Sequence, residues 1–126
     1  MSDISIQKID HSYNEWLSSL DFYLQEIGIL KERLTEIGGK NTSQEVSKEL
    51  EHYENQFTVQ RDNMERLKHN IHSSIHNMSE EAKKGAGHVD GAFQDQFSQL
   101  RALYETEETV VNELWQNCNP VSAEWM

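Results

Sequence analysis

The fold class follows from residues 8–37, KIDHSYNEWLSSLDFYLQEIGILKERLTEI, in which apolar side chains recur at alternating spacings of three and four. This spacing is the heptad pattern of a helix that packs against other helices. The seam consists of Tyr13, Trp16, Leu20, Tyr23, Ile27, Leu30, Leu34 and Ile37. Leu17 and Leu24 lie beside the seam and widen the apolar stripe to the width that a bundle helix buries. A long amphipathic helix over residues 8–37 is therefore predicted.

A second helix is predicted over residues 43–84, because the heptad pattern resumes after a glycine-rich turn. The segment Gly38-Gly39-Lys40-Asn41 has the composition of a helix stop and turn. Thr42 and Glu45 follow with the spacing of a capping box, which marks a helix N-terminus. Within the second helix, Ser73-Ser74 is the expected place for a bend, because serine competes for backbone hydrogen bonds.

A third helix is predicted over residues 88–118, after a turn at Gly85-Ala86-Gly87. We expect it to end before Pro120, because proline disfavours the helical conformation of the residue that precedes it. Residues 1–7 would then form a short arm and residues 119–126 an irregular tail. Short turns between helices make neighbours antiparallel, so the sequence predicts one all-α domain, an antiparallel three-helix bundle of coiled-coil character over residues 1–126.

Composition indicates a thin, acidic bundle. Hydrophobic residues make up 36% of the chain, and 22 Asp and Glu against 11 Lys and Arg give a formal charge of −11. Such a charge repels phosphate backbones and anionic lipid headgroups. We therefore expect neither a nucleic-acid partner nor a membrane partner.

The termini and the cysteine content favour a cytoplasmic location. The segment MSDISIQKID lacks the basic region and the apolar stretch of a secretory signal. The single cysteine, Cys118, cannot form a disulfide within the chain.

A histidine-rich face on the second predicted helix is the first candidate site. His69, His72 and His76 share a face with Glu65 and Glu80, on the side away from the apolar seam. Two imidazoles four residues apart can bind a divalent metal ion together with a carboxylate. One helix cannot complete the coordination sphere, so a solvated polar face is the simpler interpretation, and a metal site would need a second helix or a symmetry-related copy of the chain.

Glu107 is the second candidate, because it interrupts the apolar seam of the third predicted helix. A lone ionised carboxylate in a core is costly. When the three predicted helices are aligned through their turns, Arg61 of the second and Trp16 of the first lie at the same height along the bundle as Glu107. The sequence therefore predicts a polar layer of Glu107, Arg61 and Trp16. The alternative is that Glu107 reaches solvent at a gap in a thin bundle.

No motif indicates catalysis, and no cofactor is expected apart from a possible divalent metal. The first functional hypothesis is a non-catalytic interaction or scaffold protein that binds a protein partner or a second copy. The alternative is a metal-binding bundle that uses the histidine face.

Self-association is expected from two features of the chain. Phe22 and Ile29 lie seven residues apart on the far side of the first helix from its seam, which predicts an apolar strip in a homodimer interface. The second predicted helix is also longer than the other two. The exposed end of its stripe must therefore be covered by a second molecule or by the chain's own tail, and we expect the tail residues Val121, Trp125 and Met126 to pack there.

Overall fold

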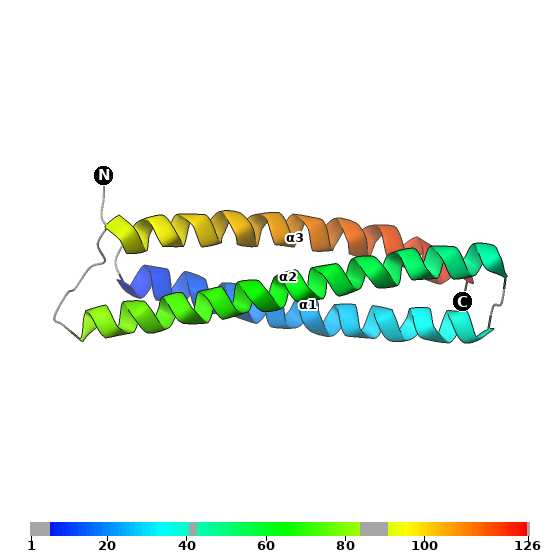
Figure 1. The fold of residues 1–126 in the computed structure, drawn as a ribbon, viewed down its shortest axis with the longest axis horizontal. Helices are drawn as coiled ribbons and strands as arrows, with labels where there is room; N and C mark the ends of the chain where they lie inside the picture. Colours follow the sequence, from blue (N-terminus) through cyan, green and yellow to red (C-terminus); the bar gives the residue numbers. More distant parts are fainter. Residues whose placement is uncertain (1–5, 41–42, 84–90, 126) are drawn as a thin grey trace.

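The computed structural model describes residues 6–40, 43–83 and 91–125, which form three long helices. Helix α1 spans Ile6–Lys40, α2 spans Gln44–Ala82 and α3 spans Gly91–Trp125. Helices α1 and α3 run parallel and α2 runs antiparallel to both (Figure 1). The predicted all-α three-helix bundle is therefore confirmed. None of the helices, over their described residues, is long and apolar enough to cross a membrane.

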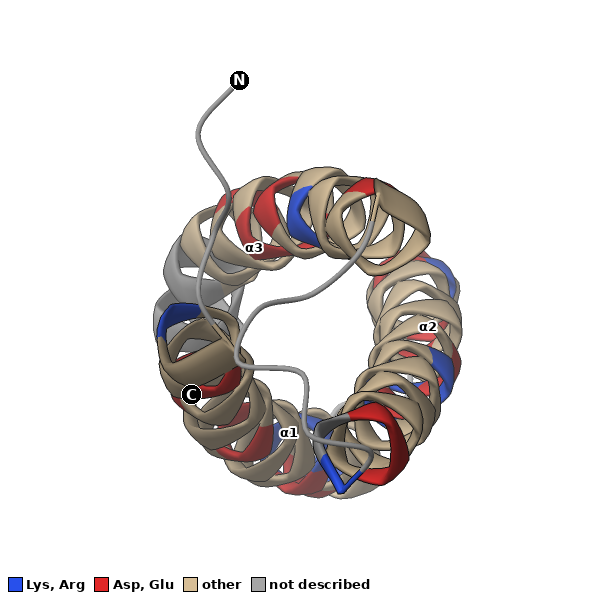
Figure 2. Ribbon diagram, turned by 90° about the vertical axis from the view of Figure 1, so that its left-hand side faces the viewer, with Lys and Arg blue, Asp and Glu red and all other residues tan. Residues whose placement is uncertain are grey.

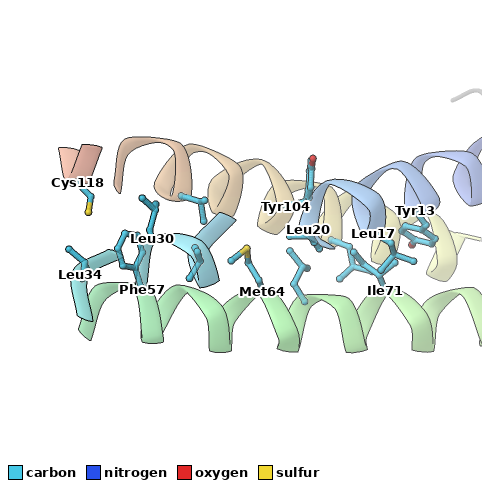
Figure 3. Packing of buried hydrophobic residues seen from close by; sticks show 14 of the residues in the cluster. Tyr13, Leu17, Leu20, Leu30, Leu34, Phe57, Met64, Ile71, Tyr104 and Cys118 are labelled. Atoms are coloured by element: carbon cyan, nitrogen blue, oxygen red, sulfur yellow. The ribbon is translucent and has the colours of Figure 1, made fainter. Parts of the chain in front are cut away.

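A single hydrophobic core follows the axis of the bundle, and each helix contributes one stripe to it (Figure 3). The α1 seam supplies Tyr13 and Leu20, which are 1% and 0% exposed, and the α2 seam supplies Phe57, Met64 and Ile71. Burial of one such side chain contributes about 1.5–3 kcal/mol. The heptad spacing therefore identified the buried face of the helices.

The C-terminal end of α1 differs from the prediction. Gly38, Gly39 and Lys40 continue the helix rather than form a turn, and Asn41 lies outside the described residues. Ile37 is buried at this end, and a Cβ atom added at Gly38 would lie 3.4 Å from Leu50 Cδ1 of α2. Tertiary packing against α2 therefore outweighs the weak helix propensity of two glycines.

The N-cap of α2 is Ser43, so the predicted capping box is wrong. Ser43 has extended backbone angles, and its side-chain oxygen accepts a 3.3 Å hydrogen bond from the Val46 backbone N–H. The cap lies one residue later than expected, and Thr42 lies outside the described residues. Serine satisfies an otherwise unpaired N–H of the first turn equally well.

Helix α2 is unbroken at Ser74, where a bend was expected. The Ser74 side chain is 1% exposed and bonds to the other two helices instead of to its own backbone. Its hydroxyl lies 3.0 Å from the Tyr13 hydroxyl of α1 and donates to Gln96 Oε1 of α3 at 3.2 Å. The serine therefore fixes the relative positions of three helices.

Helix α3 continues through Pro120, so the predicted end at residue 118 and the irregular tail are wrong. Cys118, two residues earlier, is completely buried in the core. We attribute the continuation to this packing, which holds the helix in place where a proline would otherwise end it. Helix α3 begins at Gly91 and has 35 residues, as α1 has, against 39 in α2. The three helices thus nearly match in length, and the predicted turn at residues 85–87 lies outside the described residues.

Candidate interaction surface

Helices α1 and α3 face each other along one side of the bundle and contact each other less than either contacts α2. An apolar cavity of about 170 Å³ lies there. Its floor is the buried core, and its walls come from the two parallel helices. We call it the α1/α3 pocket, and it is lined by Phe22, Tyr23, Glu26, Ile27, Phe57, Val111, Asn112 and Trp115.

Two large apolar side chains at this pocket are exposed to solvent. Phe22 of α1 is 57% exposed and Trp115 of α3 is 39% exposed. Ile29, one heptad beyond Phe22, is 47% exposed. A cavity of about 150 Å³ with apolar walls is large enough to hold a benzene ring. The pocket therefore has room for one large apolar side chain from outside the bundle.

The carboxylate of Glu108 links the two helices beside the pocket. Its Oε2 atom accepts hydrogen bonds from the hydroxyls of Tyr23, at 3.1 Å, and Tyr104, at 2.9 Å. Burial raises the pKa of Tyr104 to about 12, and the neighbouring carboxylate adds to the rise against the opposing hydrogen bond with Ser19. Both hydroxyls therefore stay protonated at neutral pH and keep donating to Glu108.

The pocket carries negative charge without a cation to balance it. Glu26 is half-buried on the pocket wall, and Glu108 is half-buried on the neighbouring turn. Across the described ranges, no Lys or Arg forms an ion pair with either carboxylate. Acidic positions recur along the ribbons of α1 and α3 when the bundle is viewed along its axis (Figure 2).

A second, shallower hollow extends the same side of the bundle toward the start of α1. It is lined by His11, Asn14, Glu15, Trp16, Ser18, Ser19 and Tyr104. The Trp16 ring is stacked on Phe97 and Tyr104 of α3, with centroids 5.3 Å from each. The Tyr104 hydroxyl bonded to Glu108 connects this hollow with the α1/α3 pocket. Together they form what we call the α1/α3 groove.

The histidine face lies on the outside of α2. His69, His72 and His76 are all exposed. Among the residues that the structure describes, no three His, Cys, Asp or Glu side chains come together as a metal-binding group.

Glu107 is buried, at 9% exposure, but its partner is Gln60 rather than Arg61. With the Gln60 amide nitrogen facing the carboxylate, Nε2 donates to Oε2 at 2.6 Å. Arg61 is exposed and bonds to Asp62 at 3.4 Å. The prediction placed Arg61 inside by assuming a straight helix. A heptad of 3.5 residues per turn keeps the Gln60 position on the seam and turns Arg61 outward.

The other predicted layer member, Trp16, packs on aromatic rings rather than on Glu107, as described above for the groove. Of the predicted tail residues, Val121 and Trp125 belong to the helical backbone of α3, whereas Met126 lies outside the described residues. Phe22 and Ile29 are exposed on α1, as the prediction required. Their role in a homodimer stays a prediction.

Sequence reasoning did not find Glu108 or the α1/α3 pocket. One signal was available, because Tyr23 and Tyr104 occupy seam positions and a partly buried tyrosine hydroxyl usually needs a hydrogen-bond partner. Their partner could not be identified from spacing along one helix, because Tyr23 and Glu108 are 85 residues apart in the chain.

No protein family matches this chain, and no curated protein or solved structure is significantly similar to it.

Proposed function

We propose that this protein is a non-catalytic interaction or scaffold module, and that the α1/α3 groove is its binding surface. The observation that carries the proposal is the apolar pocket whose walls include the exposed rings of Phe22 and Trp115. Exposed apolar patches of this kind mark interaction sites more often than isolated surface residues do. Two further features, the unbalanced carboxylates and the hollow beside Trp16, extend the same surface along the bundle.

Site-specific photo-crosslinking in the cells that naturally produce the protein tests the proposal. A photoreactive amino acid at Asn112, an exposed position in the pocket wall, should give a discrete crosslinked product. The same amino acid at Val59, which is 52% exposed on α2, is the matched control and should give none. Equal products at both positions, or none at Asn112, would count against the groove as the binding surface.

The mass of the product separates two kinds of occupant. Self-association through Phe22 and Ile29 would give a product of twice 14.7 kDa. A product of any other mass identifies a different protein as the partner.

A further inference from the structure

We propose that the occupant of the α1/α3 groove is a basic amphipathic helix of another protein. One large apolar side chain of that helix enters the α1/α3 pocket, and Lys or Arg residues beside it pair with Glu26 and Glu108. This inference rests on the proposed function, since it names the class of partner for the same groove.

The geometry of the groove favours a helix over an extended peptide. Helices α1 and α3 run parallel, the two hollows of the groove lie between them, and none of the described residues is a strand whose edge could pair with a peptide. The apolar side chains on the α1 side, Phe22 and Ile29, are seven residues apart, which is two helical turns. A docked helix matches that repeat with its own heptad and completes a four-helix arrangement.

The charges favour a basic helix. Glu26 has no ion-pair partner among the described residues, and the two hydrogen bonds of Glu108 come from neutral hydroxyls. Glu15, the other carboxylate in the lining of the groove, lies 3.0 Å from His11. The apolar pocket is therefore flanked by two half-buried carboxylates, neither of which has an ion-pair partner among the described residues. A cation close to a carboxylate that is partly removed from water gains more than one at a fully exposed site.

The same charges disfavour a second copy of this chain. Suppose that two α1 helices packed antiparallel with Phe22 opposite Ile29 of the second copy. In that register Glu15 of each copy would face Glu36 of the other. If they packed parallel, Glu26 would face Glu26. Each copy carries a formal charge of −11, so the dimer would also bring together two strongly acidic molecules.

Titration with two designed helical peptides tests the inference on the full chain. The first peptide has Leu and Phe at heptad seam positions and Lys at the flanking positions, and the second has Glu in place of every Lys. Fluorescence anisotropy of the labelled peptides should show one-to-one binding of the Lys peptide and at least about tenfold weaker binding of the Glu peptide.

Two double variants with the same change in net charge provide the control. Glu26→Gln with Glu108→Gln should weaken binding of the Lys peptide about tenfold or more, while the new amide oxygen beside Tyr23 and Tyr104 still accepts from their hydroxyls. Glu51→Gln with Glu65→Gln, at exposed positions on α2, should leave the affinity nearly unchanged. Melting curves by circular dichroism confirm that both variants fold.

Three results would overturn the inference. They are equal loss of affinity in the two double variants, equal binding of the two peptides, and no binding of the Lys peptide at all. A product of twice 14.7 kDa in the crosslinking experiment would also overturn it, because a second copy would then occupy the groove. A product of other mass at Asn112 without Lys-peptide binding would leave the proposed function standing and reject only the basic class of partner.

Discussion

Gln60 of α2, with its amide nitrogen facing α3, donates a 2.6 Å hydrogen bond to the Glu107 carboxylate, and both side chains are buried. Gln60 is uncharged, so it does not offset the lost hydration of the Glu107 carboxylate as a cation would. Burial therefore raises the pKa of Glu107 above its ordinary value of 4.5. The bond from Gln60 favours the ionised form and limits that rise.

This pKa shift predicts the pH dependence of Glu107→Gln. Between pH 4.5 and the raised pKa, the folded protein binds more protons than the unfolded chain, so the free energy of unfolding falls as pH rises. The variant lacks this group, and a Gln side chain can still bond to Gln60. We expect Glu107→Gln to be more stable than the wild type at pH 7, on the order of 1 kcal/mol. The advantage should shrink below pH 4.5.

Thermal melts of the wild type and of Glu107→Gln measure this difference. They are recorded between pH 3 and pH 8 at intervals of about one pH unit. Gln60→Leu is the complementary control, because it removes the donor while Glu107 stays buried. Its destabilisation should be larger at pH 7 than at acidic pH. A constant difference between wild type and Glu107→Gln across the range would show that Glu107 titrates in the folded protein as it does in the unfolded chain.

The bonds of Ser74 to Tyr13 and Gln96 predict that Ser74→Ala is destabilising. The change leaves the buried Tyr13 hydroxyl and the half-buried Gln96 amide with fewer partners, at a cost of about 1–3 kcal/mol. For a domain of this size, the melting temperature should fall by roughly 4 °C per kcal/mol. The neighbouring Ser73 is exposed, so the free energy of unfolding of Ser73→Ala should stay within about 0.5 kcal/mol of the wild type. Equal effects of the two changes would mean that the three-helix link contributes nothing.

Gly28→Ala should stabilise the protein. Gly28 lies in the middle of α1, and a Cβ atom added there would meet nothing within 4 Å. Alanine is better than glycine in a helix interior by about 0.5–1 kcal/mol. Gly38→Ala serves as the comparison, because its Cβ would contact Leu50 near the end of the helix, and its gain should be smaller. Urea titration gives both values, and a loss of stability at Gly28 would show that α1 is strained there.

The bundle itself was predictable because its seams repeat regularly, and each seam decides locally which face is buried. Local sequence signals predicted the wrong helix ends where tertiary packing determines how far the helix continues. Gly38 and Pro120 both carry the signature of a helix end, yet the buried side chains of Ile37 and Cys118 lie beside them and hold the helices in place. Ser74 likewise bonds across the bundle rather than to its own helix.

The candidate site was less predictable, because it depends on how α1 and α3 are rotated toward each other. Exposure of Phe22 follows from the helical repeat of α1 alone. The pocket beside Phe22 is completed by Trp115 of α3, and the hydrogen bond from Tyr23 to Glu108 lies next to it. Both features bring together residues from opposite ends of the chain. A single sequence contains no information on that rotation beyond the width of each apolar stripe.

The rate at which the Cys118 thiol is alkylated tests whether the last turns of α3 pack as firmly as the burial of this side chain indicates. The side chain is 0% exposed, and burial raises the pKa of its thiol to about 11. At pH 8 the thiolate that reacts with iodoacetamide is then on the order of a hundredfold scarcer than at an ordinary thiol. Mass spectrometry should therefore show alkylation of the native protein at least about a hundredfold slower than in denaturant. Asn117→Cys with Cys118→Ala moves the thiol to an exposed neighbouring position, and this variant should react at nearly the unfolded rate. If native Cys118 reacted as fast as that variant, the end of α3 would be open in solution, and the continuation of the helix through Pro120 would not be held by packing.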